Sequence, residues 1–174
     1  MTNSMDDIAE QAQAIFIIGS NTTEQHPVFG ARIRQAVLKR GVKLVVSDPR
    51  ATDITEFATL HMRPRGGTDI ALINGLINII LEKGWEDNDY IAARTENFEE
   101  FEANLKNYDP PKVSEITGIP VEELYKAAEI LATNKPMALV YAMGVTQHTV
   151  GVQNVLSCAN LQMVLDEFVK KMKK

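Results

Sequence analysis

The sequence has little cysteine and no long apolar run. Cys158 is the single cysteine among 174 residues, so the chain forms no internal disulfide and no zinc or iron–sulfur site built from several cysteines. No apolar run approaches the ~18 residues of a membrane-spanning helix, and no basic leader with an apolar core precedes Ala14. We therefore expect neither a membrane span nor an export signal in this sequence, and a cytoplasmic location.

An excess of positive charge is also absent. The net charge is -5 at pH 7 and the isoelectric point is about 5.2. Such a surface disfavours broad contact with a phosphate backbone, so nucleic acid is not an expected partner. The hydrophobic content of 45% is enough for a real core in a chain of this length. We expect a single domain over residues 1–174, with a helical excursion at about 85–134 and an atypical tail at 164–174.

Glycine is scarce where a dinucleotide fingerprint would need it. That fingerprint requires three glycines at fixed spacing after the first strand, whereas Gly19 is followed by no other glycine before Gly30. What the sequence has instead is an apolar run at 14–18, a polar segment at 19–27, a helical pattern to Arg40 and a second apolar run at 44–46. Apolar runs without alternation predict strands buried on both faces, and two of them joined by a helix predict a βαβ unit.

Later segments extend this pattern. Short strands are expected at residues 60–62 and 138–141, and helices at 52–58, 70–81, 87–94, 97–108 and 120–133. The helix at 70–81 is apolar almost all round, which predicts burial between the sheet and another layer or domain. The predicted fold is α/β: a three-layer, Rossmann-like parallel sheet with helices on both faces.

Polar segments follow the strands at residues 19–27, 47–50 and 142–148. Ligands of such sheets bind beyond the carboxyl ends of the strands, so we take this edge as the site. Asp48 suits either a ribose hydroxyl or a turn opened with Pro49, and residue type does not separate the two. Arg50 suits a phosphate or a nearby carboxylate such as Asp53.

Thr68 and Asp69 stand where the helix at 70–81 begins. Thr68 is expected as its N-cap, and Asp69 complements the positive end of the helix. Guanine offers a second explanation, because its N1–H and N2–H2 are adjacent donors that one carboxylate can accept. The residues alone favour the helix-end explanation for Asp69.

A catalytic constellation is not evident. His26, His61 and His148 have no metal-ligand spacing and are expected at helix starts or in packing. Cys158 stands among Val155, Leu156, Ala159 and Leu161, which predicts a buried apolar residue rather than a nucleophile. The predicted edge therefore binds a ligand and does not itself react.

The strand-end segments together resemble the molybdopterin oxidoreductase family, most closely the alpha subunits of molybdenum- or tungsten-dependent formate dehydrogenases. The resemblance runs from about residue 7 to residue 163 and includes the turn at 117–120. The segments that carry it are Gly19-Ser20-Asn21-Thr22-Thr23-Glu24-Gln25-His26-Pro27, Ser47-Asp48-Pro49-Arg50, Gly67-Thr68-Asp69 and Tyr141-Ala142-Met143-Gly144-Val145-Thr146-Gln147-His148.

In that family the segment is one of two related α/β domains that hold a bis-(molybdopterin guanine dinucleotide) cofactor. The resemblance implies that Asp69 recognises guanine, that Asp48 contacts the ribose or base, and that residues near Gln147 lie towards the pterin. The implied cofactor-binding residues are Gly19, Ser20, Asn21, Glu24, His26, Ser47, Asp48, Pro49, Arg50, Gly67, Thr68, Asp69, Met143, Gly144 and Gln147.

The resemblance also implies what lies elsewhere in the family. Its members carry the iron–sulfur cysteines and the cysteine or selenocysteine metal ligand upstream of this segment. A catalytic histidine follows that ligand, and a substrate-binding arginine lies further downstream. None has a counterpart here, and Cys158 does not match the ligand position. We interpret the chain as an inactive fragment of an enzyme that oxidises formate and works with its remaining domains and electron-transfer subunits.

Three alternatives remain open at the level of sequence. Another substrate of the same family, such as nitrate, is compatible with the segment. A stand-alone nucleotide-binding module, like the central domain of thiamine-diphosphate enzymes, predicts binding of an adenine dinucleotide. A structural or interaction domain predicts self-association without a ligand.

Overall fold

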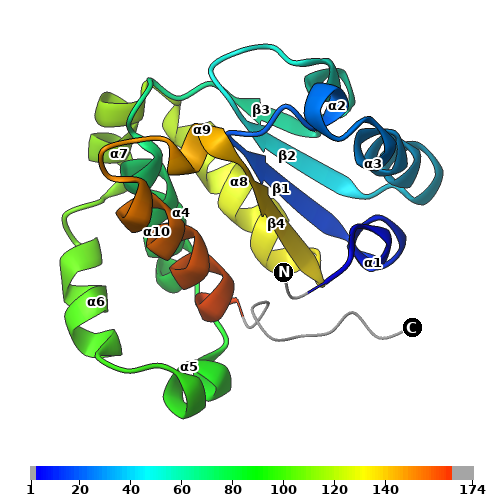
Figure 1. The fold of residues 1–174 in the computed structure, drawn as a ribbon. Helices are drawn as coiled ribbons and strands as arrows, with labels where there is room; N and C mark the ends of the chain where they lie inside the picture. Colours follow the sequence, from blue (N-terminus) through cyan, green and yellow to red (C-terminus); the bar gives the residue numbers. More distant parts are fainter. Residues whose placement is uncertain (1–2, 166–174) are drawn as a thin grey trace.

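A four-stranded parallel sheet forms the centre of the computed structural model, which describes residues 3–165. The strand order is β3-β2-β1-β4 (Figure 1). The strands are β1 (Ala14–Ile18), β2 (Lys43–Ser47), β3 (Leu60–Met62) and β4 (Met137–Tyr141). Ile18 is level with Ser47 on one side and with Tyr141 on the other, so three strands end at one edge. The atypical tail predicted at 164–174 lies outside the described residues from 166 onwards.

Successive residues of β1 enter different cores on the two faces of the sheet. Ile15 and Ile17 pack with residues of α1 (Met5–Gln11) and α3 (Pro27–Arg40). Ala14, Phe16 and Ile18 belong to the core beneath α4 (Asp69–Glu82) and α8 (Val121–Thr133). All five residues of β1 are buried, as expected for a parallel strand covered by helices on both sides. The predicted α/β class and parallel sheet are confirmed.

Helix α3 begins and ends where its sequence predicts. Pro27 occupies the first turn, where its missing N–H breaks no helical hydrogen bond. Gly41 ends the helix in the left-handed conformation, and its N–H donates to the carbonyl of Val37. Phe29 and Ile33 face the sheet and are buried. Helix α3 thus covers one face of the βαβ unit.

Helix α4 is buried by other helices of the same chain. It packs against α7 (Pro110–Thr117), α8 and α10 (Gly151–Val164), with α6 (Phe98–Leu105) further along. Figure 1 shows these helices grouped on one side of the sheet. The apolar circumference predicted for α4 is therefore explained by its own neighbours, and no further domain is needed to cover it.

Shorter elements complete the chain. The expected helices near 52–58, 87–94 and 97–108 correspond to η1 (Asp53–Phe57), α5 (Asn88–Arg94) and α6. Three short helices were not predicted: α2 (Thr22–Gln25), α7 and α9 (Met143–Thr146). Helix α7 opens with Pro110 and Pro111, a pair that suggests a break in sequence but is tolerated in the first turn of a helix. No helix within residues 3–165 is long and apolar enough to cross a membrane.

The close approach of α4 and α7 yields a prediction at Gly75. A Cβ placed on Gly75 would lie 2.8 Å from both γ-methyl carbons of the buried Val113, and Val113 has little rotamer freedom. Alanine favours a helix over glycine by about 1 kcal/mol, but overpacking costs about 1–3 kcal/mol. We therefore expect Gly75→Ala to lower the free energy of unfolding in denaturant melts.

A matched background separates packing from helix propensity. Val113→Ala removes both γ-methyl groups and leaves only the Cβ of residue 113, 3.2 Å from the added Cβ, so Gly75→Ala should there be much less destabilising. If Gly75→Ala is equally destabilising in both backgrounds, the contact with Val113 is not the cause.

Candidate functional site

Backbone hydrogen bonds join the loops that follow β1, β2 and β4. The Gly19 N–H donates to the Ser47 carbonyl at 3.1 Å, and the Gly144 N–H donates to the Gly19 carbonyl at 3.0 Å. The Asp48 N–H donates to the Met62 carbonyl at 3.2 Å, which ties in β3. The predicted convergence of polar segments at one sheet edge is thus formed by the main chain itself.

Gly19 and Gly144 touch backbone to backbone. Gly19 has a φ of +56°, and a Cβ added to it would lie 2.8 Å from the Gly144 carbonyl carbon. A Cβ added to Gly144 would lie 2.6 Å from the Gly19 carbonyl oxygen. Real Cβ atoms do not approach backbone atoms so closely, so neither position accommodates a side chain without displacing a loop. The contact explains why a glycine is needed here although the three-glycine fingerprint is missing.

The loop after β1 has a buried half and an exposed half. Ser20, Asn21 and Thr22 are buried, and the Asn21 Oδ1 accepts a hydrogen bond from the Thr23 hydroxyl at 3.0 Å. Glu24 and His26, at the end of α2, are exposed. Of the predicted residues in this loop, the first ones shape the site edge and the last ones face outwards.

Asp48 is almost fully buried, with 3% of its surface exposed. Its Oδ1 accepts from the Arg50 N–H at 2.9 Å and lies 3.4 Å from the Arg50 Nε. The turn suggested by Asp48-Pro49 is therefore formed, and the partner of Arg50 is Asp48 rather than Asp53. The His61 Nε2 lies 2.9 Å from the Asp48 carbonyl oxygen, so His61 braces the loop from β3.

The third loop places Asp69 in the first turn of α4. Thr68 is the N-cap by position, but its hydroxyl donates to the Arg65 carbonyl at 2.7 Å and makes no capping bond. Thr68 thus occupies the predicted N-cap position, but its hydroxyl bonds the preceding turn instead of a backbone N–H of α4. Gly67 has a φ of +81° in the exposed turn that leads to Thr68.

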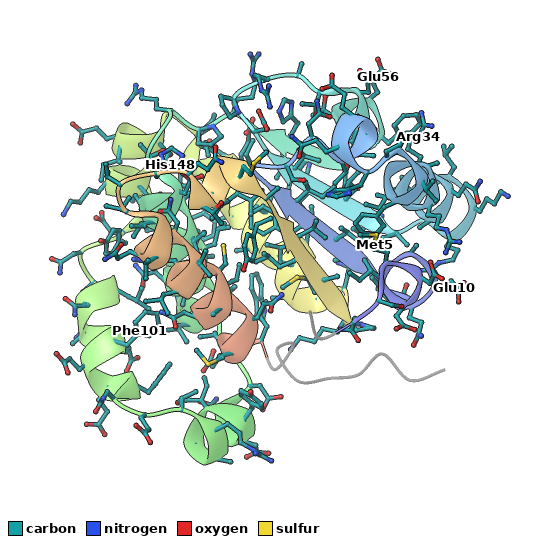
Figure 2. All side chains as sticks on the ribbon, in the orientation of Figure 1. Met5, Glu10, Arg34, Glu56, Phe101 and His148 are labelled. Atoms are coloured by element: carbon teal, nitrogen blue, oxygen red, sulfur yellow. The ribbon has the colours of Figure 1, made fainter. Side chains whose placement is uncertain are left out.

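The loop after β4 forms the short helix α9. Met143 and Gln147 are exposed neighbours, with the Gln147 Nε2 3.3 Å from the Met143 Sδ. The His148 Nε2 lies 2.8 Å from the Gly144 carbonyl oxygen. Figure 2 shows His148 at the carboxyl edge of the sheet, opposite the end that carries Glu10. The buried amide of Asn154 in α10 donates to the Val145 carbonyl at 2.9 Å, a support that the sequence analysis missed.

The pKa of Asp69 depends on charged residues of two other loops. Burial raises the pKa of the Asp69 carboxyl and the charge of Asp48 adds to this rise, while its own backbone N–H and His148 oppose it. The influence of Asp48 and His148 shows that the loops after β2 and β4 lie near the start of α4. An acid that is costly to ionise in the free protein is suited to a ligand that brings hydrogen-bond donors.

Several buried hydroxyls lack a protein partner near this edge. Thr22 Oγ1, Ser47 Oγ and Thr52 Oγ1 have no hydrogen-bond partner among the described residues. They belong to the start of α2, the end of β2 and the start of η1. Buried polar groups left unpaired cost about 1–3 kcal/mol each. Together with the close-fitting glycines, they fit an edge that receives a polar ligand.

Within residues 3–165, no group of three or more His, Cys, Asp and Glu side chains is arranged to hold a metal ion. Cys158 is 2% exposed, and burial raises the pKa of its thiol to about 12. The thiolate is the nucleophilic form, so this cysteine is chemically inert at neutral pH. The sequence prediction of a buried Cys158 is confirmed.

The chain is a parallel α/β domain whose strand-end loops meet at one edge of the sheet. A family profile described as molybdopterin oxidoreductase matches residues 1–172, and the chain belongs to that family. Membership confirms the resemblance seen in the strand-end loops. It also implies a molybdopterin cofactor for the enzymes of which such a domain is part.

Individual relatives sharpen the comparison. The chain is 40% identical over 164 residues to the F420-dependent formate dehydrogenase 1 subunit alpha of Methanococcus maripaludis, covering 94% of this chain and 24% of the relative. It is 34% identical over 164 residues to formate dehydrogenase H of Escherichia coli, covering 94% of this chain and 23% of the relative. Acetylene hydratase from Pelobacter acetylenicus has a similar structure, with a TM-score of 0.86 and 31% identity over 92% of this chain and 22% of that one. The chain spans about a quarter of the length of these relatives.

The glycine contact predicts unequal effects of two alanine substitutions. Gly19 and Gly41 both have positive φ, but no atom lies within 4 Å of a Cβ on Gly41. Gly41→Ala should lower the free energy of unfolding by about 1–2 kcal/mol, the cost of placing a residue with a Cβ in the left-handed conformation. Gly19→Ala should cost a further ~1–3 kcal/mol because it also displaces Gly144. Equal losses of unfolding free energy in denaturant melts would show that the loop around Gly144 moves aside for a Cβ on Gly19 at little cost.

The raised pKa of Asp69 predicts a pH-dependent effect of Asp69→Asn without ligand. A carboxyl whose folded pKa exceeds its unfolded value contributes stability below the unfolded value and loses it as pH rises through the folded value. The melting temperature of the variant minus that of the wild type should therefore increase from pH 4 to pH 7. Asp89→Asn, in the exposed first turn of α5, is the control and should show no such increase. A gap that is constant with pH contradicts a raised pKa of Asp69.

Proposed function

We propose that this chain is a cofactor domain of a formate dehydrogenase alpha subunit and holds one half of a bis-(molybdopterin guanine dinucleotide). The observation that carries the proposal is Asp69, a carboxyl of raised pKa at the start of α4, within electrostatic reach of Asp48 and His148. We take residues 1–174 as one domain of the longer enzyme. The likeness to formate dehydrogenase alpha subunits supports the choice of parent.

The hydrogen-bond donors of guanine match the two acceptor oxygens of the Asp69 carboxylate. Its N1–H and N2–H2 would donate to the two carboxylate oxygens, and such charge-assisted pairs are stronger than neutral ones. Adenine has a ring acceptor where guanine has N1–H, so it would meet the carboxylate with a lone pair. The Asp69 backbone N–H and His148 offset the desolvation of this carboxyl in part, and a ligand that supplies donors would offset more of it.

The neighbouring loops would hold the ribose and pyrophosphate. Arg50 bonds the Oδ1 of Asp48, and the other carboxylate oxygen would accept from a ribose hydroxyl. The segment from Gly19 to His26, the unpaired Ser47 hydroxyl and the Arg50 guanidinium would surround the phosphates. Pro49, Gly67 and Thr68 would shape the walls. Met143, Gly144 and Gln147 would lie towards the pterin.

In the intact enzyme, the metal and pterin supply the redox chemistry: formate loses two electrons and a proton and becomes carbon dioxide. The metal is molybdenum or tungsten, and the electrons would leave through iron–sulfur centres in the remaining part of the polypeptide and through partner subunits. This chain's own residues bind and orient the dinucleotide. We propose that the chain alone does not oxidise formate, and that the parent enzyme is cytoplasmic.

Thermal melting with guanosine diphosphate, set against adenosine diphosphate, tests the proposal. A ligand that binds only the folded chain at about 100 times its dissociation constant stabilises by ~2.7 kcal/mol. We expect a rise in melting temperature with the guanine nucleotide and a much smaller one with the adenine nucleotide. Asp69→Asn should abolish the difference, because an amide NH2 would face the guanine donors.

Asp89→Asn is the matched control, since it also removes an acid from the first turn of a helix. It should leave the guanine response unchanged. Equal responses to the two nucleotides would contradict guanine recognition and favour the adenine-binding alternative. The absence of any response at millimolar nucleotide would contradict a half-site that binds by itself.

A further inference from the structure

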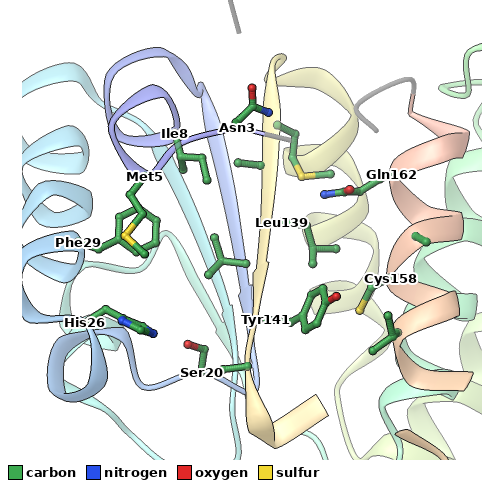
Figure 3. A pocket seen from close by; sticks show the side chains of 16 residues that line it. Asn3, Met5, Ile8, Ser20, His26, Phe29, Leu139, Tyr141, Cys158 and Gln162 are labelled. Carbon is green, nitrogen blue, oxygen red and sulfur yellow. The ribbon is translucent and has the colours of Figure 1, made fainter. Parts of the chain in front are cut away.

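A groove of about 600 Å³ runs along β4, which forms one edge of the sheet (Figure 3). Every residue from 137 to 142 lines this groove. Since side chains of a strand alternate between its two faces, a cavity lined by six consecutive residues lies beside the free edge of the strand. The groove is therefore shaped by an open sheet edge, and at one end it reaches Ser20, His26 and Ala142 of the loops at the carboxyl ends.

Hydrogen bonds between β1 and β2 show which residues of β1 direct their backbone groups to each neighbouring strand. The Lys43 N–H donates to the Gln13 carbonyl at 2.9 Å, and the Gly19 N–H donates to the Ser47 carbonyl at 3.1 Å. Along a parallel strand the backbone groups of successive residues point to opposite sides. The odd-numbered residues of β1 thus bond β2, and the even-numbered ones are directed to β4.

The same alternation assigns the backbone of β4. The Pro136 carbonyl accepts from the Gln13 N–H at 2.9 Å, just before β1, and from the Ala14 N–H at 3.5 Å, where the even-numbered pairing of β1 begins. In the observed register the even-numbered residues of β4 then bond β1. The N–H and C=O groups of Met137, Leu139 and Tyr141 point into the groove. An exposed row of this kind is a template for another strand.

Apolar side chains flank this row on both faces of the sheet. Figure 3 shows β4 between the two walls, with Phe29 on one side and Cys158 on the other. The apolar wall residues are Met5, Ile8 and Phe29 on the side of α1 and α3, and Leu139, Tyr141, Val155, Cys158 and Ala159 on the side of α10. None of the described residues that line the groove is Asp, Glu, Lys or Arg. An occupant would have to present apolar side chains on both of its faces, as β1 does.

We propose that this groove binds an extended apolar segment as a fifth strand that pairs with β4. The backbone row supplies the hydrogen bonds, and the two walls receive alternate side chains. The segment would come from the other three quarters of the polypeptide that the relatives possess, since this chain covers only 24% of one of them. That source rests on the proposed function, whereas the strand-binding edge does not.

A labelled peptide tests the edge directly. The probe is Lys-Lys-Val-Ile-Val-Ile-Val-Lys-Lys, and its control carries proline in place of both isoleucines, so that it cannot form a paired strand. Fluorescence anisotropy should show binding of the probe at least tenfold tighter than that of the control. Amide hydrogen exchange at Leu139 and Tyr141 should slow at least tenfold when the probe is bound.

Two variants of the protein examine the geometry. Leu139→Pro removes an N–H that faces the groove and takes no part in pairing with β1, so it should weaken binding at least tenfold. Val155→Lys places a charge in one wall and should do the same, which keeps the test valid if the proline variant folds poorly. Leu38→Lys, on α3 at a position that is 71% exposed and outside the groove, should leave binding unchanged.

Contrary results are readily distinguished. Lack of binding, equal binding of both peptides, or slowed exchange away from β4 overturns the proposal. Dimers in analytical ultracentrifugation that Leu139→Pro disperses would show that a second copy of this chain occupies the edge, and would overturn the assigned source. The measurements need no nucleotide, so failure of this proposal leaves the guanine response untouched, and the reverse also holds.

Discussion

The contact between Gly19 and Gly144 is the constraint on which the arrangement of the site depends. It joins the ends of β1 and β4 through a single backbone hydrogen bond and leaves no room for a Cβ on either residue. The same Gly19 reaches Ser47 through its N–H. Three loops are thus held in one place by main-chain atoms, whose positions do not depend on side-chain rotamers. The hydroxyls of Thr22, Ser47 and Thr52 near this edge have no partner among the described residues.

Polar side chains from α10 and β3 hold other parts of the same loops. Asn154 reaches the Val145 carbonyl from α10, and His61 reaches the Asp48 carbonyl from β3. Each of these side chains bonds a backbone carbonyl, a common way for a polar side chain to be satisfied inside a protein. Such supports lie behind the residues that would touch a cofactor. The precision of a binding site depends on them as much as on the contact residues.

The two exposed features of the domain have different chemistry. The carboxyl edge combines Asp48, Asp69 and Arg50 with unpaired hydroxyls, which suits a polar and charged ligand. The β4 edge has no Asp, Glu, Lys or Arg among the described residues that line it, and its walls are mostly apolar, which suits a polypeptide strand. A domain that spans about a quarter of its relatives would need both kinds of surface. One would hold the cofactor and the other would join the rest of the chain.

Local sequence determined most of the fold. Unbroken apolar runs predicted β1, β2 and β4, the short segment Leu60-His61-Met62 predicted β3, and Pro27 and Gly41 predicted the ends of α3, because strand burial and helix capping are local properties. The order of the loops along the chain was enough to indicate the family. Tertiary structure alone decided which partner each polar group takes. Arg50 bonds Asp48 rather than Asp53, and Thr68 bonds Arg65 instead of capping α4. Only in three dimensions do Asp48, Asp69 and His148 influence one another, since contacts between distant segments depend on packing geometry that no single segment contains.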